Sequence, residues 1–140
     1  MPLSPSLELQ GAIVDRLKAD VALIGLIAER VYDHVPRGSN GAVTADFPFV
    51  GMADSHELRD DVLCQHGWEI IFSFDAWSRK PGFVEARQIV HAMVESLHNW
   101  DAPLPTNRLI TLQHRQTRMF RDPDGLTSHG VVEFVAHVTE

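Results

Sequence analysis

The sequence predicts an α+β fold, in which a mostly antiparallel β-sheet carries helices packed on one of its faces. Some segments place apolar residues three or four positions apart, as helices do, and others alternate apolar with polar residues, as strands do. The last two alternating segments are joined by a tight turn, which favours antiparallel pairing. The chain has 140 residues, of which 44% are hydrophobic. This length is typical of one domain, so residues 1–140 are predicted to form a single domain.

Three helices are predicted from caps and apolar spacing. Ser4 is a good N-cap with Pro5 at the first helical position, and the next apolar residues share one face: Leu9, Ala12, Ile13 and Leu17. Asp20 caps a short second helix that runs through Ile27. The third helix is predicted over Phe83–Asn99, with a stripe formed by Phe83, Ala86, Val90, Met93 and Leu97.

The strands follow from alternation. The clearest strand is predicted over Gly67–Trp77, where Trp68, Ile70, Phe72, Phe74 and Ala76 share one face. The first four of these residues are predicted to pack against Phe83, Val90, Met93 and Leu97 of the third helix. Further strands are predicted over Val31–Val35, Phe47–Met52, Arg108–Phe120 and His129–Thr139.

Two connections have distinct compositions. The polar segment Ala53–His66 is acidic at its centre and is predicted to form a hairpin tip or a mobile arm. Asp122–Gly125 has the composition of a tight turn, with Gly125 at a positive φ. Pro123 interrupts any calcium-loop pattern there, so the turn is expected to be structural.

Charge and cysteine content narrow the function classes. The formal net charge of −7 disfavours bulk attraction to nucleic acid and to anionic membranes. A single cysteine, Cys64, cannot form an internal disulfide. The N-terminus lacks the features of a signal peptide, and no apolar run approaches the ~20 residues that cross a bilayer. We therefore expect an intracellular protein without membrane association.

The sequence contains no recognisable catalytic apparatus, so neither an enzyme nor a cofactor is expected. His91, Glu95 and His98 lie at i, i+4 and i+7 on the third predicted helix, a spacing that can present metal ligands on one face. The metalloprotease pattern of two histidines with an intervening glutamate is absent, so a polar flank of the helix is preferred and no metal is expected. The alternative left open is a small metal- or substrate-binding enzyme that uses this helix face.

One basic cluster stands out in the acidic chain. Arg115, Arg118 and Arg121 follow Arg108 on one predicted strand. On a regular strand Arg115 and Arg121 share a face and Arg118 takes the other. Aromatic residues that would stack bases are scarce there, so pairing with acidic partner groups is preferred to nucleic-acid binding. The candidate assembly interface comprises these three arginines together with Asp60 and Asp61.

Four segments resemble a phage-associated family catalogued as a domain of unknown function, DUF3168. They are Val31–Pro36, Phe47–Val50, Ala76–Arg79, and Arg121–Gly125 leading to His129–Val131. The family is similar to tail terminator, or tail completion, proteins of long-tailed phages and gene transfer agents.

This resemblance implies a structural protein of tail-terminator-like fold that forms a homohexameric ring at the head-proximal end of the tail. The implied partners are other copies of the chain, the tail tube protein and the head–tail connector or stopper protein, with DNA passing through the channel without specific binding. The implied location is the head–tail junction of a virion or gene transfer agent particle, after assembly in the host cytoplasm. A neighbouring connector or minor tail protein is the second possibility within the same family.

Overall fold

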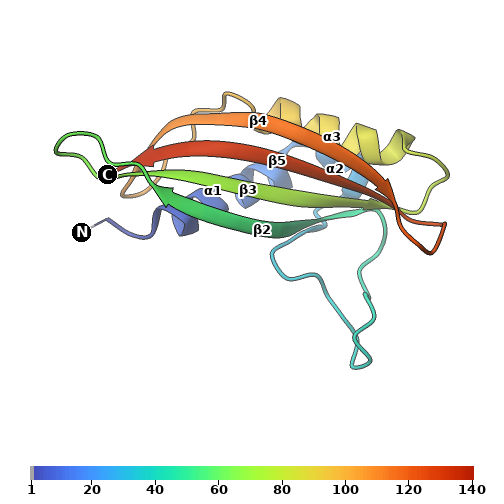
Figure 1. Cartoon of the computed structure of the whole chain (residues 1–140). Coiled ribbons are helices and arrows are strands. Elements are labelled where there is room, and N and C mark those ends of the chain that lie inside the picture. Colours follow the sequence, from blue (N-terminus) through green and yellow to red (C-terminus); the bar gives the residue numbers. More distant parts are fainter. Residues whose placement is uncertain (1) are drawn as a thin grey trace.

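A computed structural model describes residues 2–140 of the chain. One sheet forms the front of the molecule and the helices lie behind it (Figure 1). The elements in order are α1 (Pro5–Ala19), α2 (Val21–Ile27), β1 (Val31–Tyr32), β2 (Phe49–Arg59), β3 (Gly67–Ser78), α3 (Val84–Leu97), β4 (Arg108–Arg121) and β5 (Ser128–Thr139). No helix in this part of the chain is long and apolar enough to span a membrane.

The sheet has the strand order β1-β2-β3-β5-β4. Only the short β1 pairs in parallel, with β2, and every other neighbouring pair is antiparallel. β3 and β5 pair over their full lengths, from Gly67 opposite Thr139 to Ser78 opposite Ser128. The predicted α+β class with a mostly antiparallel sheet is thus confirmed.

The core lies between the helices and the face of the sheet against which they pack. On that face β3 and β5 contribute alternate residues, among them Phe72 and Phe134, whose rings stack with centroids 5.6 Å apart. The helices add one apolar stripe each to the same cluster: Leu9, Ile13 and Leu17 from α1, Leu23 and Ile27 from α2, and Ile89, Val90, Met93 and Leu97 from α3. The predicted facing of the β3 residues against the third helix is confirmed for the residues of this cluster.

Two aromatic residues predicted in this core lie at its margin instead. Trp68 is half-buried, with the Arg59 guanidinium 5.1 Å from its ring centroid. Phe83 is the N-cap residue of α3 and lies between Arg87 and Arg121, whose guanidinium groups are 5.6 and 4.5 Å from its ring. Both residues lie at the start of their element, Trp68 in β3 and Phe83 before α3, where fewer core neighbours surround a side chain than in the middle.

Local chemistry sets the helix ends as predicted. The Ser4 hydroxyl accepts a hydrogen bond from the Leu7 N–H at 3.3 Å, and the Asp20 carboxylate accepts one from the Leu23 N–H at 2.9 Å. Gly130 then allows α3 to approach the sheet closely. A Cβ atom there would lie 3.1 Å from the side chain of Val90 of α3 and from the sulfur of Met119, so a larger residue would require both side chains to shift.

The early strands differ from the sequence prediction. The strand predicted over Val31–Val35 ends at Tyr32. It pairs only with Val50 and Gly51 of β2, and the chain turns away before Pro36. The second begins at Phe49 and continues to Arg59, well beyond the predicted Met52. Pairing with the apolar β3 extends this polar strand, so Ala53–His66 is a strand end and hairpin tip and not a mobile arm.

Glu8 ties the first helix to the start of β4. The residue is only 7% exposed, and its carboxylate accepts hydrogen bonds from the backbone N–H groups of Thr106 and Asn107 and from both of their side chains, at 2.7 to 3.2 Å. Burial opposes ionisation, but these donors outweigh it and hold the pKa of Glu8 below its ordinary value. The contact fixes the connection that precedes β4.

Candidate assembly interface

The arginines of β4 do not follow the phase of a regular strand. The β4–β5 register shifts between His114, opposite Phe134, and Gln116, opposite Glu133, so Arg115 is an extra residue in a β-bulge. The bulge reverses the phase beyond it. Arg118 lies opposite Val131 on the face away from the helices, which we call the open face, whereas Arg121 turns toward the helix side and Phe83.

The predicted grouping of Arg115 with Arg121 is therefore wrong. Arg115 points to the open face, where its Nε lies 3.6 Å from the Glu133 carboxylate. Arg121 stacks on Phe83, so both side chains already have partners within the chain. Arg118 has only the ring of Phe120, 5.3 Å from its guanidinium, and no ion pair within the described residues. Among the three predicted arginines, Arg118 is the best placed to meet a partner.

The two acidic residues of the hairpin tip are also occupied internally. Asp61 accepts a hydrogen bond from the Gly67 N–H at 3.0 Å and lies 3.5 Å from Arg59. That backbone bond lowers the pKa of Asp61 most, and the nearby Arg59 guanidinium and His66 imidazole lower it further. Asp60 lies 3.6 Å from His137. Asp61 thus stabilises the hairpin itself, and Asp60 contacts the neighbouring strand β5.

The histidines of the third helix do not form a metal site. α3 ends at Leu97, and His98 turns to β4, where its Nδ1 accepts a hydrogen bond from the His114 N–H at 3.0 Å. His91 and Glu95 remain on the helix and line a shallow groove with Arg16 and Asp20. Within residues 2–140 no three metal-ligating side chains are close enough to hold an ion. The predicted i+7 position is lost because the helix ends one residue earlier.

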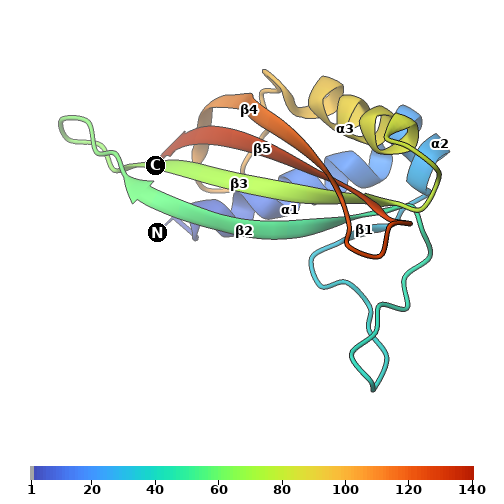
Figure 2. The same cartoon turned by 45° about the vertical axis from the view of Figure 1, so that its right-hand side comes forward.

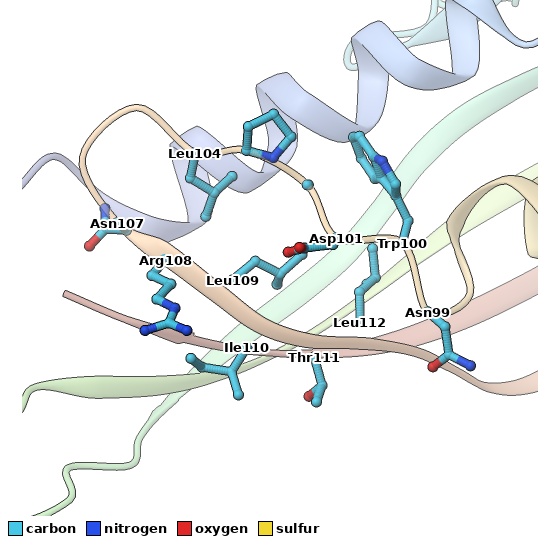
Figure 3. Close-up of a pocket in the computed structure, with 12 residues that line it drawn as sticks. Asn99, Trp100, Asp101, Leu104, Asn107, Arg108, Leu109, Ile110, Thr111 and Leu112 are labelled. Atoms are coloured by element: carbon cyan, nitrogen blue, oxygen red, sulfur yellow. The ribbon is translucent and has the colours of Figure 1, made fainter.

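A hollow runs beside the first half of β4 (Figure 3). The connection after α3 forms one wall with Trp100, Asp101 and Leu104, and β4 forms the other with Arg108 and Ile110. The Asn99 N–H donates to the Leu112 carbonyl at 2.8 Å. The connection thus covers the outer edge of β4 up to His114, and the second half of that edge stays uncovered by any backbone partner among the described residues.

A second cluster, which lies on the open face, was not predicted from the sequence. Asp75 of β3 binds the His129 Nε2 of β5 at 2.6 Å, and the imidazole stacks on Trp77 with ring centroids 3.8 Å apart. Phe120 of β4 lies 5.8 Å from the same imidazole. Only the strand register brings these residues together, although Asp75 and Trp77 do alternate with the core residues of the predicted strand. The cluster stiffens the sheet next to Arg118.

Residues 33–48 form an arm that projects from the sheet beside β2 (Figures 1 and 2). Backbone bonds close it on itself, with the Gly38 N–H donating to Ala42 and the Thr44 N–H to Pro36, at 2.8 and 2.9 Å. At its base the centroid of the Phe47 ring lies 4.9 Å from that of Phe49. The Arg79 guanidinium carbon lies 4.0 Å from the same Phe47 centroid. Most of the arm is exposed, which is typical of a segment that contacts a partner.

The turn between β4 and β5 is structural, as predicted. Gly125 has a φ of +72° and its N–H donates to the Asp122 carbonyl at 3.0 Å. The Asp124 carboxylate accepts from the Thr127 hydroxyl and from the N–H groups of Leu126 and Thr127, at 2.7 to 2.9 Å. These bonds hold the pKa of Asp124 below its ordinary value, and the bond from the Thr127 hydroxyl has the largest effect. The carboxylate is thus engaged by the turn itself.

Comparison with protein families matches residues 11–139 to the tail completion protein gp17 family. The match spans nearly the whole chain. The chain belongs to the tail completion protein gp17 family. No curated protein matches the chain in sequence.

Among solved structures, the fold is similar to a chain of a virion of a native gene transfer agent particle. The TM-score is 0.86 with 24% sequence identity, and the alignment covers 96% of this chain and 97% of the other. This likeness confirms the α+β fold expected from the sequence, which the chain shares with a component of that particle. The expected resemblance to tail completion proteins is confirmed by the family match, and this match supports the expected location in a phage or gene transfer agent particle. The chain is thus a structural tail protein.

Proposed function

We propose that this tail completion protein is a tail terminator: a homohexameric ring that caps the head-proximal end of the tail tube and joins it to the head connector. Its membership of the tail completion family over residues 11–139 is the observation that carries the proposal. The partners on this proposal are further copies of the chain, the tail tube protein and the connector or stopper protein. The protein acts by assembly and has no catalytic role.

The surface of the fold supports assembly. Both sheet edges keep a stretch of strand without a backbone partner among residues 2–140, and such edges invite another chain. The arm formed by residues 33–48 adds a second exposed contact element away from the sheet. A subunit that must contact its own copies as well as proteins above and below needs several separate surfaces of this kind.

The charge of the chain suits a DNA channel. Each copy carries a formal charge of −7, so a ring of copies has a strongly negative field. This field repels DNA phosphates and lets DNA pass without specific binding. The enzyme alternative loses its basis, because His98 is turned to β4 and does not join His91 and Glu95.

Localisation in the particle tests the proposal. The chain is produced with a short tag at its C-terminus, which lies at an end of the sheet, and tagged particles are labelled and imaged by electron microscopy. We expect label only at the head–tail junction of particles that remain functional. Label at the distal tip or along the tail would instead make the chain a minor tail protein and contradict the terminator assignment.

A further inference from the structure

The two outer edges of the sheet are each half covered, at opposite ends. On β4 the connection after α3 covers the edge up to His114, which leaves Arg115–Arg121 free. On β2 the short β1 covers Val50 and Gly51, which leaves 52–59 without a backbone partner among the described residues. Each free stretch is long enough for a neighbouring strand to pair with it.

The two edges carry opposite charges. β4 holds four arginines and no acidic residue from Arg108 to Arg121, whereas Asp54, Glu57, Asp60 and Asp61 outnumber the single Arg59 across 53–61. The side chain of Asp54 forms no ion pair or hydrogen bond within residues 2–140, and neither does the side chain of Arg118. Opposite charges that have no partner within their own chain are available for a contact between chains.

Arg118 and Asp54 also lie on the same face of the sheet. The β2–β3 register shifts between Met52, opposite Phe74, and Ser55, opposite Phe72, so Asp54 lies in a bulge beside Ser73. Ser73 pairs with Glu133 on the open face, and Arg118 lies opposite Val131 on that face. The two side chains therefore project to one side when the two edges meet.

We propose that β4 of one copy pairs antiparallel with β2 of the next copy, with Arg118 of the first next to Asp54 of the second. The inference rests on the proposed ring and assigns its subunit contact. Strand direction agrees with it, because β2, β3, β5 and β4 alternate in direction across the sheet. In a ring without flipped subunits, β4 then runs opposite to the β2 that follows it, and the alternation continues.

The covered halves impose an offset between neighbouring sheets. Within one chain Arg118 lies opposite Val131, Val131 opposite Asp75, and Asp75 opposite Gly51. Arg118 and Gly51 are therefore at the same position along the strand direction. Gly51 is already paired with β1, so an unshifted neighbour would meet a covered edge. A shift of about three residues, roughly 10 Å along the strand, brings the two free stretches together. Closing a sheet on itself requires such a stagger, so the offset favours a closed ring.

The same charges disfavour other pairings. Two β4 edges would bring arginines against arginines, and two acidic β2 edges would also repel. Only the contact between unlike edges is attractive. A contact between two different surfaces is heterologous, and heterologous contacts generate rings when the rotation closes.

Cysteine cross-linking in assembled particles tests the contact. Cys64 is first replaced by Cys64→Ser, and Asp54→Cys is combined with Arg118→Cys. Neighbouring strand positions are close enough for a disulfide. We expect loss of the monomer band on non-reducing gels of oxidised particles, with its return on reduction. The matched control combines Asp54→Cys with Arg108→Cys, which lies on the same face of β4 but beside the covered half, and should stay monomeric.

Charge exchange provides the second test. Arg118→Glu and Asp54→Arg should each reduce the yield of functional particles, and the two together should restore it. If both double-cysteine proteins stay monomeric in particles in which microscopy shows a ring at the head–tail junction, this contact is wrong while the terminator assignment stands. If particles contain the chain but no ring, the terminator assignment fails first. Equal loss in the single and the combined charge variants would also overturn the contact.

Discussion

Replacement of Phe72 by alanine should strongly destabilise the fold. The side chain is only 4% exposed, stacks on Phe134 and meets the edge of Phe74 with centroids 6.0 Å apart. Truncation of a buried phenylalanine costs about 3–5 kcal/mol, including the cavity that remains. A domain of this size has a total stability of about 5–15 kcal/mol, so the variant should lie near the limit of folding. The melting temperature should fall by roughly 10–20 °C.

The free energy of unfolding is measured by urea titration and the melting temperature by circular dichroism, at a concentration where the chain is monomeric. Phe120→Ala is the matched control, because Phe120 is 41% exposed on the open face of the same sheet. It should lose less than about 1 kcal/mol. If Phe72→Ala melts within the range of this control, the assigned core packing between β3 and β5 is wrong.

Three further predictions follow from the contacts. Glu8→Ala should lower the free energy of unfolding in urea by about 2–3 kcal/mol, because buried donors of Thr106 and Asn107 lose their charged acceptor; a loss no larger than that of Lys18→Ala, an exposed residue of the same helix, would contradict this. Gly125→Val should impair folding more than Gly125→Asn, since Gly125 has a φ of +72°, and equal melting temperatures would refute the reasoning. The pKa of Glu8 is lower in the folded chain, so its contribution is present above the usual value of 4.5 and is lost as pH falls through the folded pKa. Acid titrations of unfolding should therefore be less steep for Glu8→Gln than for the unchanged chain, and identical slopes would refute the assigned role.

Features controlled by neighbouring residues could be predicted from the sequence. The caps Ser4 and Asp20 and the turn at Gly125 depend on a few adjacent groups, and all three are present in the structure. The alternation in Gly67–Trp77 also identified the central strand, because both its neighbours and the helices bury the same residues.

Features that depend on pairing could not be predicted in this way. The polar end of β2 is a strand because β3 pairs with it, and no pattern of its own indicates that. The bulge at Arg115 shifts the phase of the arginines after it, so alternation alone wrongly grouped Arg115 with Arg121 and separated it from Arg118. Glu8 meets Thr106 and Asn107 from the other end of the chain, a contact that only the tertiary fold creates.

The candidate interface was partly predictable from neighbouring residues and partly determined by strand pairing. The sequence identified the basic strand, yet register and intrachain partners were needed to separate Arg118 from Arg115 and Arg121. Asp60 and Asp61 were the obvious acidic residues, but Asp61 is bound within its own hairpin and Asp60 lies next to His137 of β5. Asp54 became a candidate only when the bulge placed it on the open face beside a free edge.

Tail length in particles made without this chain tests the central claim most directly. A terminator stops tube growth and joins tail to head. We therefore expect electron micrographs of a deletion strain to show unattached tails of variable length beside filled heads, with normal particles restored by the unchanged gene supplied in trans. Joined particles with tails of normal length, as functional as those of the parent, would contradict the account.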